Sequence, residues 1–288
     1  MKILGVVTSF YPDINELEKN INSFLSEIEH LIIWENTPKE NSQIYKLIEK
    51  LNSAKIEVRT TGQNEFLAVP FNLCARFAEE NNFTHMLTMD QDSCFFENNL
   101  TRFIQHSNEY KDFDKVAIFA PVHFDSRSNN LKPISENKFS KLNYSMTSGN
   151  LLSLKCLKEV GAFLDNLFID WVDEEICIRI CKMQFHIVQI NNIFMEHFVG
   201  NGSGSVRFFG KTKYYDDYAP IRFYYITRNL YILSKMYPAE AQRIKKRWKR
   251  QLIKTIKYDN HKKTLKIKYV IQGLYDYLNG VSGPYQRK

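Results

Sequence analysis

The sequence predicts an α/β fold in which a mostly parallel, doubly wound sheet is followed by a helical C-terminal extension. Short apolar runs typical of buried strands alternate with segments whose apolar residues recur at helical spacing. Of the 288 residues, 44% are hydrophobic and 25% are charged, so the chain can bury a core of ordinary size. The end of the chain is basic and has the pattern of helices.

The first 95 residues alternate between the two patterns. Apolar runs predict strands at 3–8, 31–34, 56–59 and 85–89, and helical spacing predicts helices at 14–28, 44–51 and 71–80. This order implies a parallel sheet, and ligands of such sheets bind beyond the carboxyl ends of the strands. The polar residues at those ends are candidates for a binding site: Ser9, Glu35, Thr61 and residues 90–93.

The second half is less regular. We predict strands at 116–120, 147–153, 186–190 and 193–197, and helices at 154–160 and 173–183. A long polar loop is expected at 121–144 and a glycine-rich loop at 200–210, and the chain from 218 onward is expected to be mainly helical.

The basic charge lies at the end of the chain. Residues 240–288 carry 14 Lys/Arg and three Asp/Glu, which leaves about −4 for the rest of a chain whose total is +7. Ile244, Trp248, Leu252 and Ile256 recur every four residues between basic side chains, which predicts a basic amphipathic helix. Such a helix can lie on an anionic membrane or pack its apolar stripe on the protein. We expect no nucleic-acid partner, because no nucleic-acid-binding module is recognisable.

The five cysteines form no CxxC pair. Cys177 and Cys181 share one face of a predicted helix, where buried free thiols are expected. We expect a reducing compartment, no signal peptide and no membrane span.

Two carboxylates follow the strand predicted at 85–89. Asp90 and Asp92 stand two residues apart on a turning segment and can converge on one hard cation such as Mn²⁺ or Mg²⁺. The same pattern also occurs by chance in acidic loops without a ligand. Its position at the carboxyl end of a strand, after three strand–helix units, favours the metal site.

Four motifs occur in a fixed order along the chain. They are Asp90-Gln91-Asp92-Ser93, Thr147-Ser148-Gly149-Asn150-Leu151, the sequence FIDWVDEE at 168–175 and the sequence RFYYITRN at 222–229. In this order they resemble the DQDS, TSGxL, FIDxVDxE and RxYYxxRN motifs of the family 2 rhamnosyltransferases, which have the GT-A fold. The resemblance covers about residues 3–240.

The resemblance implies a GT-A catalytic domain at 1–215 and a helical basic extension at 216–288. Within the domain, the nucleotide-binding half is expected at about 1–95 and the acceptor-binding half at about 96–215. The expected donor-binding residues are Thr8, Ser9, Glu35, Asn36, Asn64, Asn72, Asp90, Gln91, Asp92, Arg207 and Lys211. Two of these segments depart from the family. Glu35 stands where relatives carry an aspartate at the nucleotide base, and Phe66 stands where glycine is usual.

His197 is the expected third metal ligand beside Asp90 and Asp92. It ends a predicted strand and is followed closely by Gly200, as is a histidine of the family. Imidazole binds Mn²⁺ readily, although a histidine here can equally be a buried structural residue.

Asp173 is the expected general base. It begins a predicted helix, where a carboxylate can also serve only to cap the helix. The resemblance to the family implies that the aspartate at this point is the base that deprotonates the acceptor hydroxyl. Glu175 is expected to hold the acceptor, and Asp170 and Glu174 are rival bases. The expected acceptor-binding residues are Ser148, Gly149, Asn150, Trp171 and Glu174.

The segment 200–205 is followed by Arg207, Lys211 and Lys213. Its glycines permit closure, and its cations can neutralise a leaving diphosphate, so it is a candidate lid. The alternative is a solvated surface loop.

The resemblance implies inverting transfer of rhamnose from dTDP-rhamnose to a hydroxyl of a polysaccharide or lipid-linked glycan. The expected location is cytoplasmic and peripheral, on the inner face of a bacterial plasma membrane. Three alternatives remain open: the same chemistry with a UDP-galactofuranose or UDP-hexose donor, a nucleotidyltransferase, and a non-catalytic sugar-binding relative.

Overall fold

The computed structural model describes residues 1–96, 98–124, 136–197, 203–208, 211–216, 218–258 and 262–286. These residues form two units, which we describe separately. The first unit comprises Met1–Phe163 and Ile176–His197, and the second comprises Leu164–Glu175 and Phe198–Lys288. The division falls inside one helix, α6. The predicted domain boundary at residue 215 does not coincide with this division. The functional roles predicted for residues 1–215 and 216–288 stay predictions.

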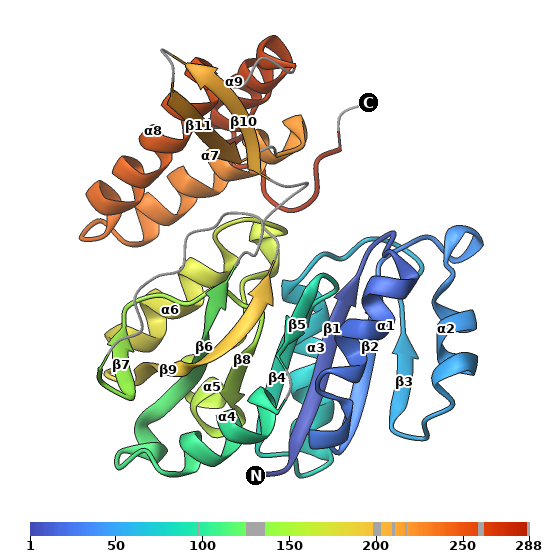
Figure 1. Cartoon of the computed structure of the whole chain (residues 1–288). Coiled ribbons are helices and arrows are strands. Elements are labelled where there is room, and N and C mark those ends of the chain that lie inside the picture. The colour runs from blue at the N-terminus through green and yellow to red at the C-terminus, as the bar shows by residue number, and fades with distance from the viewer. Residues whose placement is uncertain are drawn as a thin grey trace. The chain divides into compact units, whose positions relative to one another are not determined.

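The first part of the first unit is a parallel sheet in the order β3-β2-β1-β4. Its strands are β1 (Ile3–Ser9), β2 (His30–Glu35), β3 (Ile56–Arg59) and β4 (His85–Asp90), and its helices are α1 (Ile14–Asn22), α2 (Ile44–Leu51) and α3 (Ala68–Glu80). Helices α1 and α2 lie on one face and α3 on the other (Figure 1). Burial on both faces explains why the strands are continuous apolar runs. The predicted doubly wound arrangement is confirmed.

The helix predicted at 14–28 ends early. Helix α1 stops at Asn22, and a short 3-10 helix follows at Leu25–Glu27. The Ser23 hydroxyl donates to the carbonyl of Asn20 at the point where α1 ends. Phe24 and Ile28 are nevertheless fully buried in the core. Their helical spacing therefore reflected burial and not the length of the helix.

The sheet continues beyond β4 with antiparallel pairs. Strand β8 (Asn150–Ser153) pairs with β4, β6 (Val116–Phe124) pairs with β8, and β9 (His186–His197) runs parallel to β6. The short strands β5 (Ser93–Phe95) and β7 (Phe139–Leu142) both pair antiparallel with β9. The helices of this part are α4 (Asn99–Asn108), α5 (Leu154–Val160) and α6 (Val172–Lys182).

Several predictions for this part were wrong. The strands predicted at 186–190 and 193–197 are one strand, β9, whose pairing with β6 contains register shifts. The loop predicted at 121–144 contains the end of β6 and all of β7, while 125–135 lie outside the described residues. The strand predicted at 147–153 begins only at Asn150.

The second unit contains three helices and a hairpin among its described residues. The helices are α7 (Pro220–Met236), α8 (Ala241–Tyr258) and α9 (Lys263–Leu278), and strands β10 (Ser203–Phe208) and β11 (Lys211–Asp216) pair antiparallel. The glycine-rich loop predicted at 200–210 is thus wrong for 203–208, which pair as a strand. Residues 198–202 and 209–210 lie outside the described part.

Helices α7 and α9 approach each other very closely at Gly273. A side-chain carbon at this position would lie 2.4 Å from the carbonyl oxygen of Tyr224, so only glycine fits. One turn later, Asp276 is buried and accepts a hydrogen bond from the Tyr224 hydroxyl at 2.8 Å. These contacts fix which face of α9 is turned toward α7.

Candidate active site

The acidic turn begins where β4 ends. Asp90 is the last residue of β4, and its backbone N–H donates to the Ser148 hydroxyl at 2.9 Å. The next side chain, Gln91, accepts from the N–H of Phe10 at 2.7 Å and donates to the carbonyl of Phe10 at 3.3 Å. The Asn20 amide donates to the Gln91 carbonyl at 2.6 Å. Gln91 therefore fixes the turn to the end of β1, and its predicted contact with the donor stays a prediction.

Asp90, Asp92 and His197 come together in the first unit. One potential ligand atom from each of the three lies within 4.8 Å of the others. The His197 Nδ1 atom is 3.9 Å from Asp92 Oδ1. The pairing of β5 with β9 places Ser93 directly opposite His197, which explains why residues so far apart in sequence converge. This is the grouping that the sequence predicted.

The side chains of this cluster fit a hard divalent cation. Two carboxylates and one imidazole suit Mn²⁺, and oxygen ligands of this kind also suit Mg²⁺. The Asp92 side chain is 43% exposed, so solvent or a phosphate can complete the coordination. The Ser93 hydroxyl lies 2.7 Å from His197 Nδ1 and can donate to it or accept from it, which orients the ring for either tautomer.

The segment Ser148-Gly149-Asn150 braces the acidic turn. Ser148 is buried and donates to the Ser93 hydroxyl at 2.8 Å, while its backbone carbonyl lies 2.7 Å from His123 Nε2. Gly149 has φ +77°, and a side-chain carbon there would lie 2.6 Å from the sulfur of Met195. The segment therefore needs glycine to bring Ser148 under Asp90. The predicted contact of this segment with an acceptor stays a prediction.

Glu35 is turned into the protein. Its side chain is 1% exposed and accepts from the Thr37 N–H at 2.8 Å and the Ser42 hydroxyl at 2.7 Å. The Ser9 hydroxyl donates to it at 3.3 Å. Thr8 and Ser9, at the end of β1, are also buried. Glu35 therefore shapes the turn that follows β2, and its predicted contact with a nucleotide base would require these hydrogen bonds to change.

Asn36 and Asn64 organise the neighbouring turn. The Asn36 amide donates to the carbonyl of Phe66 at 3.1 Å and accepts from the N–H of Glu65 at 2.9 Å. Asn64 accepts from the N–H of Phe66 at 3.0 Å. Phe66 has φ +55°, the left-handed conformation that glycine adopts most readily. The departure from glycine at this position therefore keeps the backbone form. Elsewhere, the predicted donor residue Asn72 exchanges two hydrogen bonds with the backbone of Phe163.

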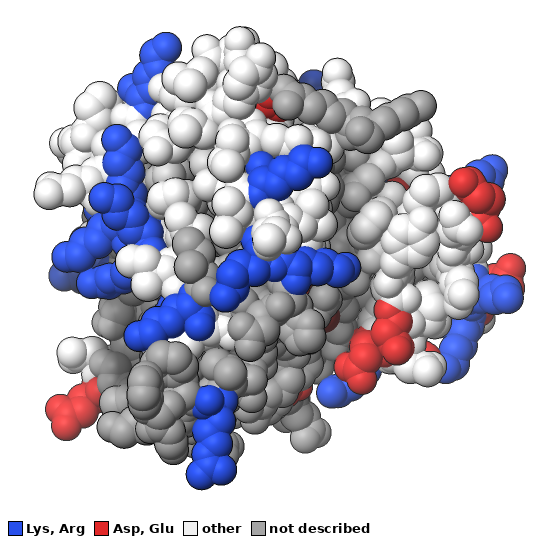
Figure 2. All heavy atoms as spheres, turned by 90° about the horizontal axis from the view of Figure 1, so that it is seen from above, with Lys and Arg blue, Asp and Glu red and all other residues white. Residues whose placement is uncertain are grey.

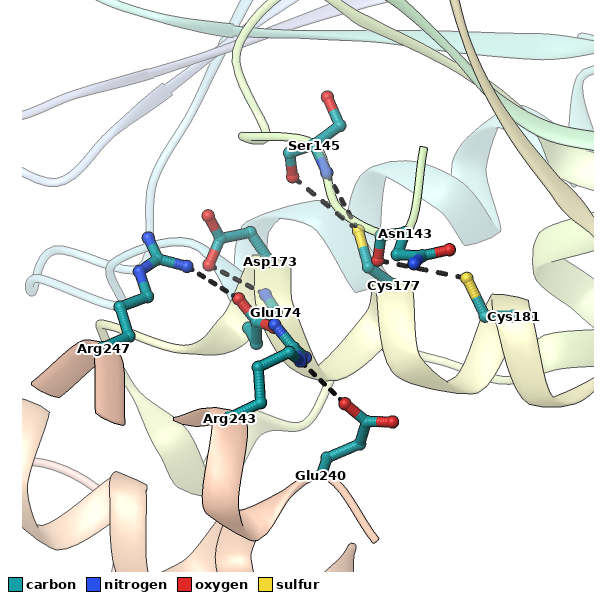
Figure 3. A network of polar contacts seen from close by, with 9 residues as sticks. All are labelled: Asn143, Ser145, Asp173, Glu174, Cys177, Cys181, Glu240, Arg243 and Arg247. Atoms are coloured by element: carbon teal, nitrogen blue, oxygen red, sulfur yellow. Dashed lines mark hydrogen bonds and ion pairs between the residues drawn. The ribbon is translucent and has the colours of Figure 1, made fainter. Parts of the chain in front are cut away.

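A second acidic cluster lies in the second unit, at the start of α6. Glu174 is 1% exposed and accepts from Arg243 Nη2 at 2.5 Å and from Arg247 Nη1 at 2.8 Å (Figure 3). Glu175 is also buried and accepts from the Tyr237 hydroxyl at 2.6 Å. Asp173 is only half-buried, and its Oδ1 accepts from the N–H of Glu174 at 2.9 Å.

These contacts rank the candidate bases. Two guanidinium groups neutralise Glu174, and a tyrosine hydroxyl donates a hydrogen bond to Glu175, so both carboxylates stabilise the unit. The rival Asp170 forms an ion pair with Arg222, with the second contact at 3.3 Å. Burial alone would lower the pKa of Arg222, but the charge and hydrogen bonds of Asp170 raise it above its usual range. Asp173 is the least buried of the three carboxylates at 173–175, and its role as the base stays a prediction.

The turn that leads to Asp173 has an unusual backbone. Phe168, Asp170 and Trp171 all have φ between +63° and +67°, although none is glycine. The buried Asn229 amide donates to the carbonyls of Leu167, Ile169 and Asp170. Trp171 adds a hydrogen bond from its indole N–H to the carbonyl of Ile226 at 2.9 Å. Such conformations persist only where the surroundings hold them, and here the motif at 222–229 does so.

No family model matches the chain. A dTDP-rhamnosyl transferase RfbF of Shigella flexneri is 25% identical to it over 253 residues, which are 81% of this chain and 80% of that protein. The S. aureus TarS 1–349 structure in complex with UDP-GlcNAc superimposes with a TM-score of 0.53 at 12% identity, over 98% of this chain and 74% of that one. GalNAc-T7 with UDP, GalNAc and Mn²⁺ gives 0.55 at 11% identity, over 68% of this chain and 44% of that one.

The chain has the GT-A glycosyltransferase fold. The predicted fold class and the resemblance to rhamnosyltransferases are thus confirmed, and the rhamnosyl transferase relative supports glycosyltransferase activity with a nucleotide sugar as donor. The GT-A neighbours are too distant in sequence to transfer a substrate, and they inform the fold alone.

Two basic residues that are predicted to bind the donor, Arg207 and Lys211, lie on the hairpin. Arg207 is exposed on β10, and Lys211 begins β11, but the side chain of Lys211 lies outside the described part. A lid formed by this segment stays a prediction.

Sequence reasoning missed several residues of the two clusters. His123, whose ring is 5.8 Å from that of His197, fell in a segment predicted to be a loop. Arg243 and Arg247 belong to the basic pattern that predicts a solvated or membrane-facing helix, whereas in the structure they neutralise Glu174. No local signal in a basic helix shows which of its cations is paired with a distant carboxylate.

Proposed function

We propose that this protein is an inverting glycosyltransferase that moves rhamnose from dTDP-rhamnose to a hydroxyl of a polysaccharide or lipid-linked glycan. The observation that carries the proposal is the convergence of Asp90, Asp92 and His197 at the end of β4 in a GT-A fold. The rhamnosyl donor is supported by the relative named for dTDP-rhamnosyl transfer.

Asp90, Asp92 and His197 would hold a divalent cation, Mn²⁺ or Mg²⁺. When bound, such an ion supplies positive charge that stabilises the diphosphate of the departing nucleotide. The hydrogen bonds of Ser93 and Ser148 keep the imidazole and the Asp90 backbone in place before the donor arrives. A preorganised site of this kind loses little free energy to rearrangement during the reaction.

Asp173 would act on the acceptor. Its ionised carboxylate takes the proton of the acceptor hydroxyl as that oxygen forms a bond to the anomeric carbon. The bond from the anomeric carbon to the nucleotide diphosphate breaks on the opposite face, and its electron pair leaves with the diphosphate. One displacement of this kind inverts the anomeric centre.

The proposed location is the cytoplasmic face of a bacterial plasma membrane. This proposal follows from the acceptor, since a lipid-linked glycan is held at a membrane. Among the described residues, no helix is long and apolar enough to cross a bilayer.

The experiment separates binding from transfer. Thermal unfolding is followed with dTDP-rhamnose, a UDP-hexose or UDP-GlcNAc, each with and without Mn²⁺, because a ligand of the native state raises its stability. Asp173→Asn is expected to keep the Mn²⁺-dependent shift with dTDP-rhamnose and to transfer rhamnose about 10³-fold more slowly. Glu159→Gln, an exposed carboxylate in the first unit, is the matched control and should behave as wild type.

Each result has a defined meaning. Transfer at the wild-type rate by Asp173→Asn would refute the base assignment. A shift with UDP-sugars and none with dTDP-rhamnose would replace the rhamnosyl donor with a UDP-sugar. If no nucleotide sugar changes the unfolding temperature, the glycosyltransferase proposal itself is wrong.

A further inference from the structure

Helix α9 presents an apolar stripe to solvent. Five residues at spacings of three, four, seven and eight share one face of this helix. Their exposed fractions are 39% for Ile267, 63% for Ile271, 36% for Leu274, 56% for Tyr275 and 72% for Leu278. An exposed apolar face of this length is uncommon on a soluble surface and marks a contact with a partner.

The opposite face of α9 holds the helix in place. Gly273 lies against the backbone of Tyr224, and Asp276 is buried beneath its hydroxyl. Lys266 is also buried, with its ammonium 5.7 Å from the centre of the Phe223 ring. The stripe is therefore turned away from α7 by fixed contacts within the second unit.

Helices α8 and α9 are both basic in composition. Helix α8 contains no acidic residue, and the single acidic residue of α9 is the buried Asp276. Basic side chains of α8 are exposed: Lys245, Lys246, Lys249, Arg250, Lys254 and Lys257. Figure 2 shows Lys and Arg side chains gathered over the left and centre of one face, around uncharged surface, whereas most Asp and Glu side chains in this view lie toward the right.

The apolar stripe predicted for α8 is not the exposed one. Ile244 is fully buried, and Trp248 and Leu252 are half-buried, while the side chain of Ile256 lies outside the described residues. Packing, and not membrane insertion, is thus the structural role of Ile244. The exposed apolar stripe of this unit therefore lies on α9.

We propose that α9 inserts its apolar stripe into an anionic membrane surface while the basic side chains of α8 contact the lipid headgroups. The exposed cations of α8 complement the negative charge of acidic phospholipids. A second copy of this chain is a poorer occupant, because pairing through the same face would bring two basic surfaces together. The inference rests on the proposed function, which places the protein at a membrane, and it names the surface that contacts this membrane. Its test needs no transfer reaction.

The test is co-sedimentation of the full chain with lipid vesicles. Vesicles contain phosphatidylcholine alone or phosphatidylcholine with about one third phosphatidylglycerol, and binding is measured at low and high salt. Wild type is expected to bind the anionic vesicles at least about tenfold more tightly than the neutral ones. The double variant Ile271→Glu/Leu278→Glu should lose at least about tenfold in binding, because it places charge in the inserted face.

Two further variants separate the contributions. Lys246→Glu/Lys249→Glu should reduce binding to anionic vesicles toward the neutral level and remove most of the salt dependence. Tyr45→Glu, at an exposed aromatic residue of α2 in the first unit, is the control and should bind as wild type. Circular dichroism checks that the variants are folded, which is expected because every substituted side chain is exposed.

Three results would overturn the inference. The first is a wild type that binds neither kind of vesicle, and the second is an Ile271→Glu/Leu278→Glu variant that binds as wild type. The third is a wild-type dimer in sedimentation equilibrium that the same variant dissociates, which would assign the stripe to a second copy. Transfer to a soluble glycan acceptor is measured separately, so its failure would count against the proposed function and not against the membrane surface.

Discussion

In the first unit, Asp90 and Asp92 converge with a histidine at the end of a strand, and the Asp92 side chain is partly exposed. In the second unit, Glu174 lies at the start of a helix, is buried, and is held by two guanidinium groups. Both regions are runs of carboxylates that the sequence marked as functional. The first group can receive a cation from outside, whereas Glu174 in the second is already neutralised by two arginines of the protein.

The carboxylates at 173–175 differ from one another in burial and in their partners. A buried carboxylate with two arginines stabilises the unit as long as all three partners remain, and it is costly when one is removed. Asp173 differs from its neighbours because it is half-buried, and it accepts one hydrogen bond from the adjacent backbone N–H. Within residues 173–175, the buried Glu174 and Glu175 are held by other side chains of the unit, and the proposed base is the half-buried Asp173.

The turn before Asp173 offers the strongest way to test this division. Asn229→Ala removes three hydrogen bonds that hold a backbone with several positive φ angles. We expect unfolding to become easier by about 2–4 kcal/mol. We also expect kcat to fall about 100-fold, with KM for the donor unchanged, because the base is displaced and the donor site is not.

Leu230→Ala is the matched control for Asn229→Ala. It empties a buried position next to Asn229 on the same helix and costs similar stability, but it removes no hydrogen bond from the turn. The folded control should keep its kcat. An equal loss of kcat in both variants would mean that Asn229 contributes stability alone.

Loss of the Glu174 ion pairs should lower stability and leave the transfer rate nearly unchanged. Glu174→Gln leaves Arg243 and Arg247 without a counter-charge, but both are half-exposed and can be resolvated. We expect a loss of about 2 kcal/mol in unfolding free energy, measured by chemical denaturation, and nearly unchanged transfer by the folded protein. A loss of transfer at unchanged stability would make Glu174 the base in place of Asp173.

Acid should weaken the first unit through His85, at the start of the strand that ends in Asp90. Burial lowers the pKa of His85 to about 4, with a smaller contribution from the N-terminal ammonium. The unfolded chain then binds the proton more readily than the folded one, so stability is lost as the pH falls from about 6.5 toward 4. The expected loss between pH 7 and pH 5 is about 1–2 kcal/mol.

His85→Phe removes this titration. Phe113 already lies beside the His85 ring, with ring centres 5.6 Å apart, so an aromatic side chain suits the site. The variant should lose less stability than wild type between the two pH values, as measured by denaturant titration at each pH. An identical pH dependence would exclude His85 as the source of the acid sensitivity.

Much of the parallel half could be predicted from local pattern. Helix α2 and strand β3 begin and end at the expected residues, because buried apolar runs and amphipathic spacing are local properties. The antiparallel half depends on pairing between distant segments. Strand β9 was divided in two by the polar pair Asn191-Asn192, although Asn191 donates hydrogen bonds to Asn137 and Ser140 and so remains in the sheet.

The candidate site was predictable in part for the same reason. Asp90 and Asp92 follow a strand that the pattern identifies, and His197 ends another, so their convergence follows from the topology. The burial of Glu174 and Glu175 could not be predicted, because it depends on arginine and tyrosine side chains more than 60 residues away. A sequence shows a run of carboxylates without showing which of them the fold neutralises.

Binding of Mn²⁺ tests the central claim most directly. Titration calorimetry with Mn²⁺ in the presence of dTDP-rhamnose compares wild type with Asp92→Asn and with the control Glu159→Gln. Wild type and the control should bind one ion with equal affinity, and Asp92→Asn should bind at least about tenfold more weakly at unchanged unfolding temperature. Equal Mn²⁺ affinity in wild type and Asp92→Asn would contradict the assignment of Asp90, Asp92 and His197 as the metal site.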